Sequence, residues 1–161
     1  MEHSPNPRET TSQFEKLLAG LVADHVDFAV VGGLAVIFNG YPRLPLEAAI
    51  LVSDAPENLQ RLINSLKGWG EGWARELKPE DFSREPGAVR LIEDFPLDMF
   101  VAMREKTIAD FRPRLRFLET GGVRIPYLAP EDLIFLKEGS WREKDQLDVA
   151  AMREIIAREG R

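Results

Sequence analysis

The sequence predicts one α/β (α+β) domain in which helices pack on a β-sheet. The first observation is an unbroken apolar run at residues 28–31, which ends at a glycine pair and continues into a second apolar segment, residues 34–38. Such a run indicates a strand covered on both faces, and the glycine pair permits a tight turn into a helix. The second observation is another glycine pair, residues 121–122, between two short runs typical of a hairpin.

The remaining elements follow in chain order. An apolar stripe behind a cap at Thr11 or Ser12 predicts a first helix that lies against the sheet. Residues 47–53 form the next strand, a helix follows with Leu59 to Leu66 on its inner face, and a short strand is expected over 73–77. Strands are also expected at 88–92, 97–101, 115–119 and 123–127, and the last two helices at 130–137 and 143–158.

Length and composition favour a single domain. The chain has 161 residues, of which 44% are hydrophobic and 30% charged, enough for one sizeable core. Residues 1–11, rich in polar residues and proline, are expected to form a flexible lead-in, and residues 12–161 a single domain.

Charge and hydropathy exclude several classes of partner. Lys and Arg number 21 and Asp and Glu 27, so the net charge of −6 opposes attraction to phosphate backbones, and an extended nucleic-acid partner is not expected. No cysteine is present, and no apolar run approaches the ~20 residues that span a bilayer. The first residues lack the pattern of a secretory signal. We therefore expect a soluble, cytoplasmic protein without a membrane partner.

Two segments carry the functional signal: FAVVGGLAVIFNGYPRLPLEAAILV at residues 28–52 and KEGSWREKDQLDV at residues 137–149. Together they resemble the DNA polymerase β-like nucleotidyltransferase superfamily, in particular its small bacterial branch related to abortive-infection toxins of toxin-antitoxin systems. The first motif of that branch runs Gly-Gly or Gly-Ser, then Arg-Ser/Thr-x-Asp-x-Asp. Arg43 matches it, whereas Pro45, Glu47 and Ala49 replace the hydroxyl residue and the two aspartates. The resemblance implies a nucleotidyltransferase-like fold with a mixed central β-sheet.

The resemblance also implies a degenerate metal site. In the family, three carboxylates hold two magnesium ions, and here the matching positions are Glu47, Ala49 and Asp98. Glu47 and Asp98 are the candidate metal ligands and catalytic acids, and a methyl group stands where the ligand shared by both metals is expected. The competing interpretation makes Glu47 an ordinary exposed acid and Asp98 an acid paired with an arginine.

The nucleotide is expected to meet cations and backbone N–H groups. The resemblance assigns phosphate binding to Gly32, Gly33, Arg43, Lys137 and Lys144, and the role of general base to Asp145. Alternatively, the charged residues of the second segment form ion pairs on the surface of a helix, such as Lys144 with Asp148.

Three functions remain open from the sequence. The leading hypothesis is a pseudoenzyme, weak or inactive as a transferase, that retains a cleft for a nucleotide or another phosphate, with a nucleoside triphosphate as candidate ligand and a weak or absent Mg²⁺ site. The second is an active transferase that moves a nucleoside monophosphate onto an acceptor. The third is a non-catalytic, antitoxin-like module that binds a protein partner.

Overall fold

A six-stranded mixed sheet forms the centre of the fold. The structure, a computed structural model, describes residues 7–160. The sheet contains, in spatial order, β3 (Val89–Ile92), β4 (Pro96–Phe100), β2 (Ala48–Val52), β1 (Phe28–Val31), β6 (Val123–Tyr127) and β5 (Arg116–Thr120). β1 runs parallel to β6 and β2 runs parallel to β4, while the other neighbours are antiparallel. The expected mixed central sheet is confirmed.

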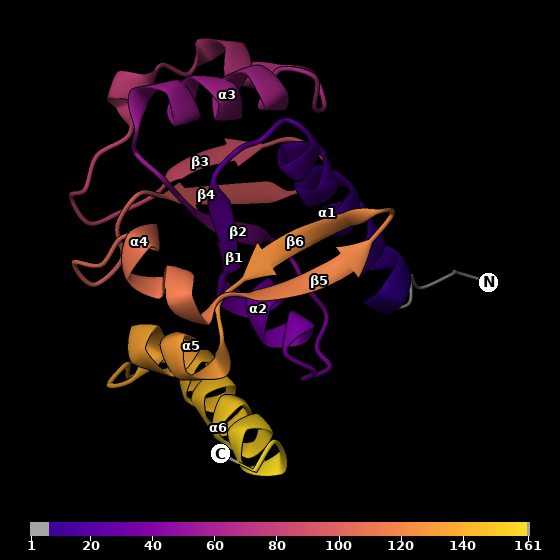
Figure 1. The fold of residues 1–161 in the computed structure, drawn as a ribbon, viewed down its shortest axis with the longest axis vertical. Coiled ribbons are helices and arrows are strands. Elements are labelled where there is room, and N and C mark those ends of the chain that lie inside the picture. The colour runs from indigo at the N-terminus through magenta and orange to yellow at the C-terminus, as the bar shows by residue number, and fades with distance from the viewer. Residues whose placement is uncertain (1–6, 161) are drawn as a thin grey trace.

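Helices surround this sheet on several sides (Figure 1). They are α1 (Pro7–Ala23), α2 (Gly32–Phe38), α3 (Pro56–Leu66), α4 (Ile108–Phe111), α5 (Pro130–Lys137) and α6 (Glu143–Arg158). Short 3₁₀ turns lie at Trp73–Glu76, Pro79–Asp81 and Arg112–Arg114. α3 lies at one end of the long axis, and α5 and α6 lie at the other (Figure 1). α2 packs on β1 and β2 and contacts both C-terminal helices, so it connects the sheet to that end of the molecule.

The core lies around the two middle strands. All four residues of β1 are buried, as expected for a strand covered on both faces. Leu18 and Leu21 of α1, Leu34 of α2 and Leu62 of α3 are buried against the same cluster. Within residues 7–160, no helix is both long and apolar enough to cross a membrane.

Most predicted elements form within a residue or two of their expected bounds, and two expectations are wrong. α1 begins at Pro7 rather than after a cap at Thr11 or Ser12, which agrees with the tolerance of the first helical turn for proline. The helix thus includes residues 7–11 of the expected lead-in, and residues 1–6 of that lead-in lie outside the described residues.

The expected strand at residues 73–77 is a 3₁₀ turn instead. Gly72, with φ of 80°, adopts a left-handed conformation that turns the chain before Trp73. The carboxylate of Glu93 then accepts hydrogen bonds from the backbone N–H groups of Glu71 and Trp73 at 2.9 and 2.8 Å. These side-chain contacts take the place of the backbone hydrogen bonds that a strand would form with a neighbouring strand.

Candidate active site

The two surviving acids of the predicted metal site lie at one place on the sheet. Glu47 directly precedes β2, and Asp98 occupies the middle of β4. Parallel pairing of β2 with β4 sets Ala49 opposite Asp98. A carboxylate at position 49 would therefore lie beside Asp98, and the chain supplies a methyl group there. We refer to Glu47 and Asp98 as the acid pair.

An arginine from the neighbouring strand joins the two members of the acid pair. Arg90 lies on β3, opposite Asp98 in antiparallel register. Its Nε and Nη2 donate hydrogen bonds to the two carboxylate oxygens of Asp98 at 2.7 and 2.9 Å. Nη2 also donates to Oε2 of Glu47 at 2.9 Å. One guanidinium group therefore holds both carboxylates.

The charge of Arg90 is permanent at any physiological pH. The hydrogen bond and charge of Asp98, followed by those of Glu47, raise the pKa of the Arg90 guanidinium above its already high value. The side chains differ in exposure: Arg90 is 50% exposed, Glu47 42% and Asp98 15%. Asp98 is thus the sheltered acid, and the guanidinium group reaches it from the solvent side.

Two carboxylates gather at this place, fewer than the three that the resemblance implies for a two-metal site. Magnesium favours six oxygen ligands in near-octahedral geometry, and a two-metal site needs carboxylates that serve both ions. Among the described residues, no three His, Cys, Asp or Glu side chains are grouped so that they could hold a metal ion. Both carboxylates that remain already accept hydrogen bonds from Arg90.

A second group of charges links the loop before β2 to the C-terminal helices. Arg43 Nη1 lies 2.5 and 2.7 Å from the two carboxylate oxygens of Asp148 on α6. Lys137 Nζ, at the end of α5, lies 2.6 Å from Asp148 and 3.5 Å from Asp145. Asp148 is only 2% exposed. We call these four residues the Asp148 network.

The network is neutral and largely shielded from solvent. Its two cations balance its two carboxylates, as a buried cluster of charges requires. Burial tends to raise the pKa of Asp145, but the hydrogen bond from Ser140 and the charges of Lys137 and Arg142 outweigh burial and lower that pKa. The Ser140 hydroxyl donates to Asp145 at 2.8 Å.

The glycine pair lies against Ala49, the neighbour of Asp98 in the sheet, and against Arg43 of the Asp148 network. A β-carbon on Gly32, where φ is +67°, would lie 3.4 Å from the β-carbon of Ala49. A β-carbon on Gly33 would lie only 3.1 Å from the central guanidinium carbon of Arg43. Gly33 therefore allows Arg43 to pack flat against the start of α2, a contact that a serine in this place would obstruct.

The predicted site residues thus fall into two adjacent groups. Glu47 and Asp98 are joined by Arg90, whereas Arg43, Lys137 and Asp145 gather around Asp148. Lys144 is the exception, because it is exposed and pairs with none of the described acids, and Asp148, its expected ion-pair partner, binds Arg43 and Lys137 instead. The competing interpretation of Asp98 as an acid paired with an arginine is confirmed, but the sequence did not identify that arginine as Arg90. The available signal was the pairing of residues 88–92 with 97–101, which brings a residue of the first strand opposite Asp98.

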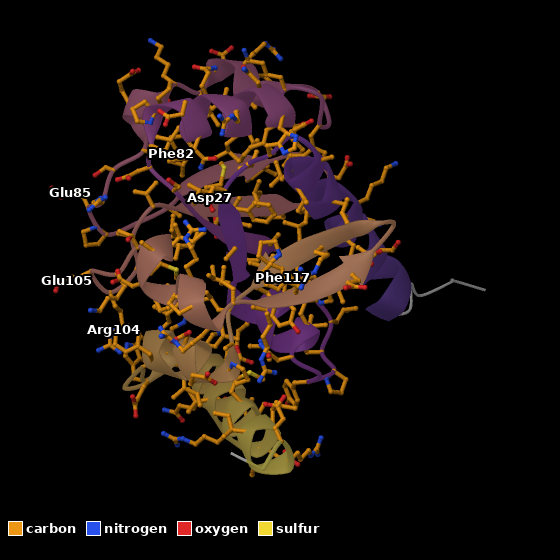
Figure 2. The ribbon with its side chains drawn as sticks, in the orientation of Figure 1. Asp27, Phe82, Glu85, Arg104, Glu105 and Phe117 are labelled. Carbon is orange, nitrogen blue, oxygen red and sulfur yellow. The ribbon has the colours of Figure 1, made fainter. Side chains whose placement is uncertain are left out.

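A cavity of about 780 Å³ opens on the same side of the sheet as Asp98. Phe100 lines it and lies two residues from Asp98 on β4, so the two side chains share a face of that strand. Leu136, the neighbour of Lys137, lines it from α5, and the turn at Arg104 and Glu105 forms part of its rim. Glu85, Arg104 and Glu105 lie along one edge of the molecule in Figure 2.

Comparison with known proteins identifies the family of this chain. The sequence profile of the family described as "Nucleotidyltransferase of unknown function (DUF6036)" matches residues 11–158. The chain belongs to this family. No curated protein sequence matches the chain significantly. The family match covers both segments of the predicted site and nearly all of the described residues.

Solved structures with nucleotidyltransferase names share the fold of this family member. The lincosamide antibiotic adenylyltransferase LnuA, solved with lincomycin bound, has a TM-score of 0.61 at 15% identity, covering 89% of this chain and 96% of that one. A putative nucleotidyltransferase from Thermotoga maritima has a TM-score of 0.57 at 16% identity, covering 97% and 98% of the two chains. An antigenic nucleotidyltransferase-like protein from Paracoccidioides brasiliensis has a TM-score of 0.56 at 15% identity, with coverages of 92% and 77%.

Proposed function

We propose that this nucleotidyltransferase-like protein retains a binding site for a nucleotide or another phosphate compound and is weak or inactive as a transferase. The observation that carries the proposal is the methyl group of Ala49 opposite Asp98. Two-metal transfer needs carboxylate oxygens at this place, and a methyl group has no lone pair. Glu47 is also one methylene longer than Asp, and a displacement of ~1 Å can cost ~10²-fold in rate.

A cavity that opens on the sheet face of Asp98 supports retention of a ligand site, although neither the acid pair nor Arg90 lines it. Its volume of about 780 Å³ falls in the range of small-molecule sites, roughly 300–1,000 Å³. Arg90, opposite Asp98 on β3, is half exposed and offers a cation for a phosphate. LnuA, which shares the fold, was solved with a small molecule bound. A nucleoside triphosphate is our candidate ligand, with a weak or absent contribution from Mg²⁺.

Thermal denaturation with ligand tests the binding part of the proposal. Adenosine, guanosine, cytidine and uridine triphosphates are added separately, each with Mg²⁺ and with a chelator. We expect one of them to raise the melting temperature by a similar amount in both conditions. A ligand present at a hundred times its dissociation constant raises the free energy of unfolding by about 2.7 kcal/mol. For a chain of this size, that corresponds to an increase in melting temperature of roughly 5–10 °C.

A lysine substitution and an assay for pyrophosphate release complete the test. Lys137→Ala is expected to lower the affinity for the triphosphate by about ten- to a hundredfold. Lys67→Ala, at an exposed position after α3, is expected to leave that affinity unchanged. Pyrophosphate release is expected at the level of a protein-free blank. Stabilisation that disappears in chelator would favour an active transferase instead, because it would show that the acid pair holds a metal.

Partner binding is a second candidate function, and a group of exposed apolar side chains favours it. Leu44 and Leu46 flank the loop that carries Arg43 and are 50% and 75% exposed. Trp141 and Leu147, at the start of α6, are 87% and 55% exposed. The contact between Arg43 and Asp148 brings these two segments together. If no triphosphate changes the melting temperature of the wild-type protein, this candidate replaces the first.

A further inference from the structure

Arg90 holds the place where the resemblance expects positive charge from metal ions. It bonds both oxygens of Asp98 and one oxygen of Glu47, and the three donor–acceptor distances lie between 2.7 and 2.9 Å. A divalent ion at the acid pair would have to bind these same oxygens beside the positive charge of Arg90. The guanidinium group and a metal ion therefore compete at the acid pair.

The guanidinium group also offsets the charge that the acid pair would otherwise leave uncompensated. Two carboxylates that share one site repel each other unless a cation lies between them. Arg90 supplies a charge that cannot be removed by deprotonation, and it cannot dissociate as a metal can. Its three hydrogen bonds thus hold the two carboxylates together without a metal ion.

Part of the hydrogen-bonding capacity of Arg90 remains available. Its bonds to the acid pair come from Nε and Nη2 alone, and among the described residues none accepts a hydrogen bond from Nη1. The side chain is 50% exposed, so the Nη1 edge can meet a ligand. Guanidinium groups match the geometry of phosphate oxygens and form charge-assisted bonds with them.

We propose that Arg90 is the resident cation of this site and takes the place of a divalent ion between the acid pair and a phosphate of the ligand. The inference rests on the proposed function, because it requires a ligand that carries phosphate. It adds that phosphate binding is metal-free and that Arg90 determines it. It also explains why the chain needs no third carboxylate at Ala49, since one guanidinium balances one of the two remaining negative charges and bridges both.

The experiment compares Arg90→Gln with Arg112→Gln. Arg112 is a matched control, because it is 51% exposed and makes a two-bond pair with Asp27 at 3.1 and 2.8 Å. Asp27 lies beside the C-terminal end of β2, whereas Glu47 precedes its N-terminal end. Inorganic triphosphate serves as the probe, so that no nucleobase contributes, and its affinity is measured by calorimetry in chelator. We expect Arg90→Gln to bind it about ten- to a hundredfold more weakly than wild type and Arg112→Gln to bind it as wild type does. Arg90→Lys keeps the positive charge but loses the planar guanidinium that forms two parallel hydrogen bonds, so its affinity for triphosphate should lie between those of wild type and Arg90→Gln.

Manganese supplies a second measurement on the same proteins. Arg90→Gln is expected to gain Mn²⁺ binding over wild type, because the acid pair is released, whereas Arg112→Gln gains none. Circular dichroism confirms that each variant is folded. Equal triphosphate affinity in Arg90→Gln and wild type would overturn the inference and leave the proposed function standing. If wild type bound neither inorganic triphosphate nor any nucleoside triphosphate, the proposed function itself would fail.

Discussion

Arg43 and Asp148, which are 105 residues apart in the sequence, form an ion pair in which Nη1 lies 2.5 and 2.7 Å from the two carboxylate oxygens. This contact fastens the loop before β2 to α6, and Lys137 joins it from α5. The loop leads directly to Glu47. The position of the acid pair therefore depends on the docking of the C-terminal helices.

Removal of Asp148 is expected to destabilise the protein strongly. Asp148→Ala leaves Arg43 and Lys137, which are 18% and 13% exposed, without their common partner. Breaking a buried pair from one side costs about 3–5 kcal/mol. Urea denaturation measures the change. Glu154→Ala, which removes an exposed pair with Arg158 on the same helix, is expected to change the free energy of unfolding by less than about 0.5 kcal/mol. Equal effects of the two substitutions would contradict a structural role for the Asp148 network.

Two glycine-to-alanine substitutions are expected to act in opposite directions. Gly33→Ala places a β-carbon 3.1 Å from the guanidinium carbon of Arg43, so the guanidinium must shift by a few tenths of an ångström, which strains its contacts with Asp148 at a cost of about 1–3 kcal/mol. Gly20→Ala, within α1, meets no atom within 4 Å and is expected to stabilise the helix by up to about 1 kcal/mol. The melting temperatures of the two variants test both expectations. A stabilised Gly33→Ala variant would show that Arg43 does not need the close contact with residue 33.

Restoration of the missing carboxylate is expected to strengthen metal binding. Ala49→Asp places an oxygen ligand beside Asp98, and Ala49→Asp combined with Arg90→Gln also removes the competing guanidinium. Calorimetry with Mn²⁺ should give tighter binding in Ala49→Asp than in wild type and tighter still in the double variant. If none of the three proteins bound Mn²⁺, the missing carboxylate at position 49 and the presence of Arg90 would not be enough to explain the lack of a metal site.

Acid is expected to weaken the Asp148 network through Asp145. The folded state lowers the pKa of Asp145 below its ordinary value of 3.8, so its ionised form contributes stability above pH 3.8 that is lost as the pH falls through the lower folded value. Asp145→Asn lacks this contribution. Unfolding measured between pH 7 and pH 3 should show wild type more stable near neutrality, with the difference shrinking below about pH 4. A difference that stays constant across this range would refute the assignment to Asp145.

The fold could be predicted in large part because its signals are local. The residues of β1 form an apolar run that can only be buried, and α5 and α6 begin and end where their proline, acidic and basic residues indicate. The turn at Trp73–Glu76 was mistaken for a strand because its conformation depends on the carboxylate of Glu93, about twenty residues further along the chain. Propensity carries no information about such a contact.

The candidate site was only partly predictable for the same reason. Family resemblance indicated Glu47 and Asp98, and the structure brings them together. Arg90 belongs to no motif, and its role follows from the register that sets it opposite Asp98. The sequence indicates Asp148 as a surface ion-pair partner of Lys144, whereas Asp148 is buried and contacts Arg43 across more than half of the chain.

The separation of Arg43 from Asp148 also sets an order of events during synthesis on the ribosome. A ribosome adds roughly 5–20 residues per second, so Arg43 emerges about 5 to 20 s before its partner. β1 precedes Arg43 in the chain, and β2, β3 and β4 are all complete in that interval. Asp98 then already has Arg90 as a partner, because only 8 residues separate them. The nascent sheet thus carries the acid pair together with Arg90 early, while the loop that bears Arg43 reaches its final position only when α6 has been synthesised.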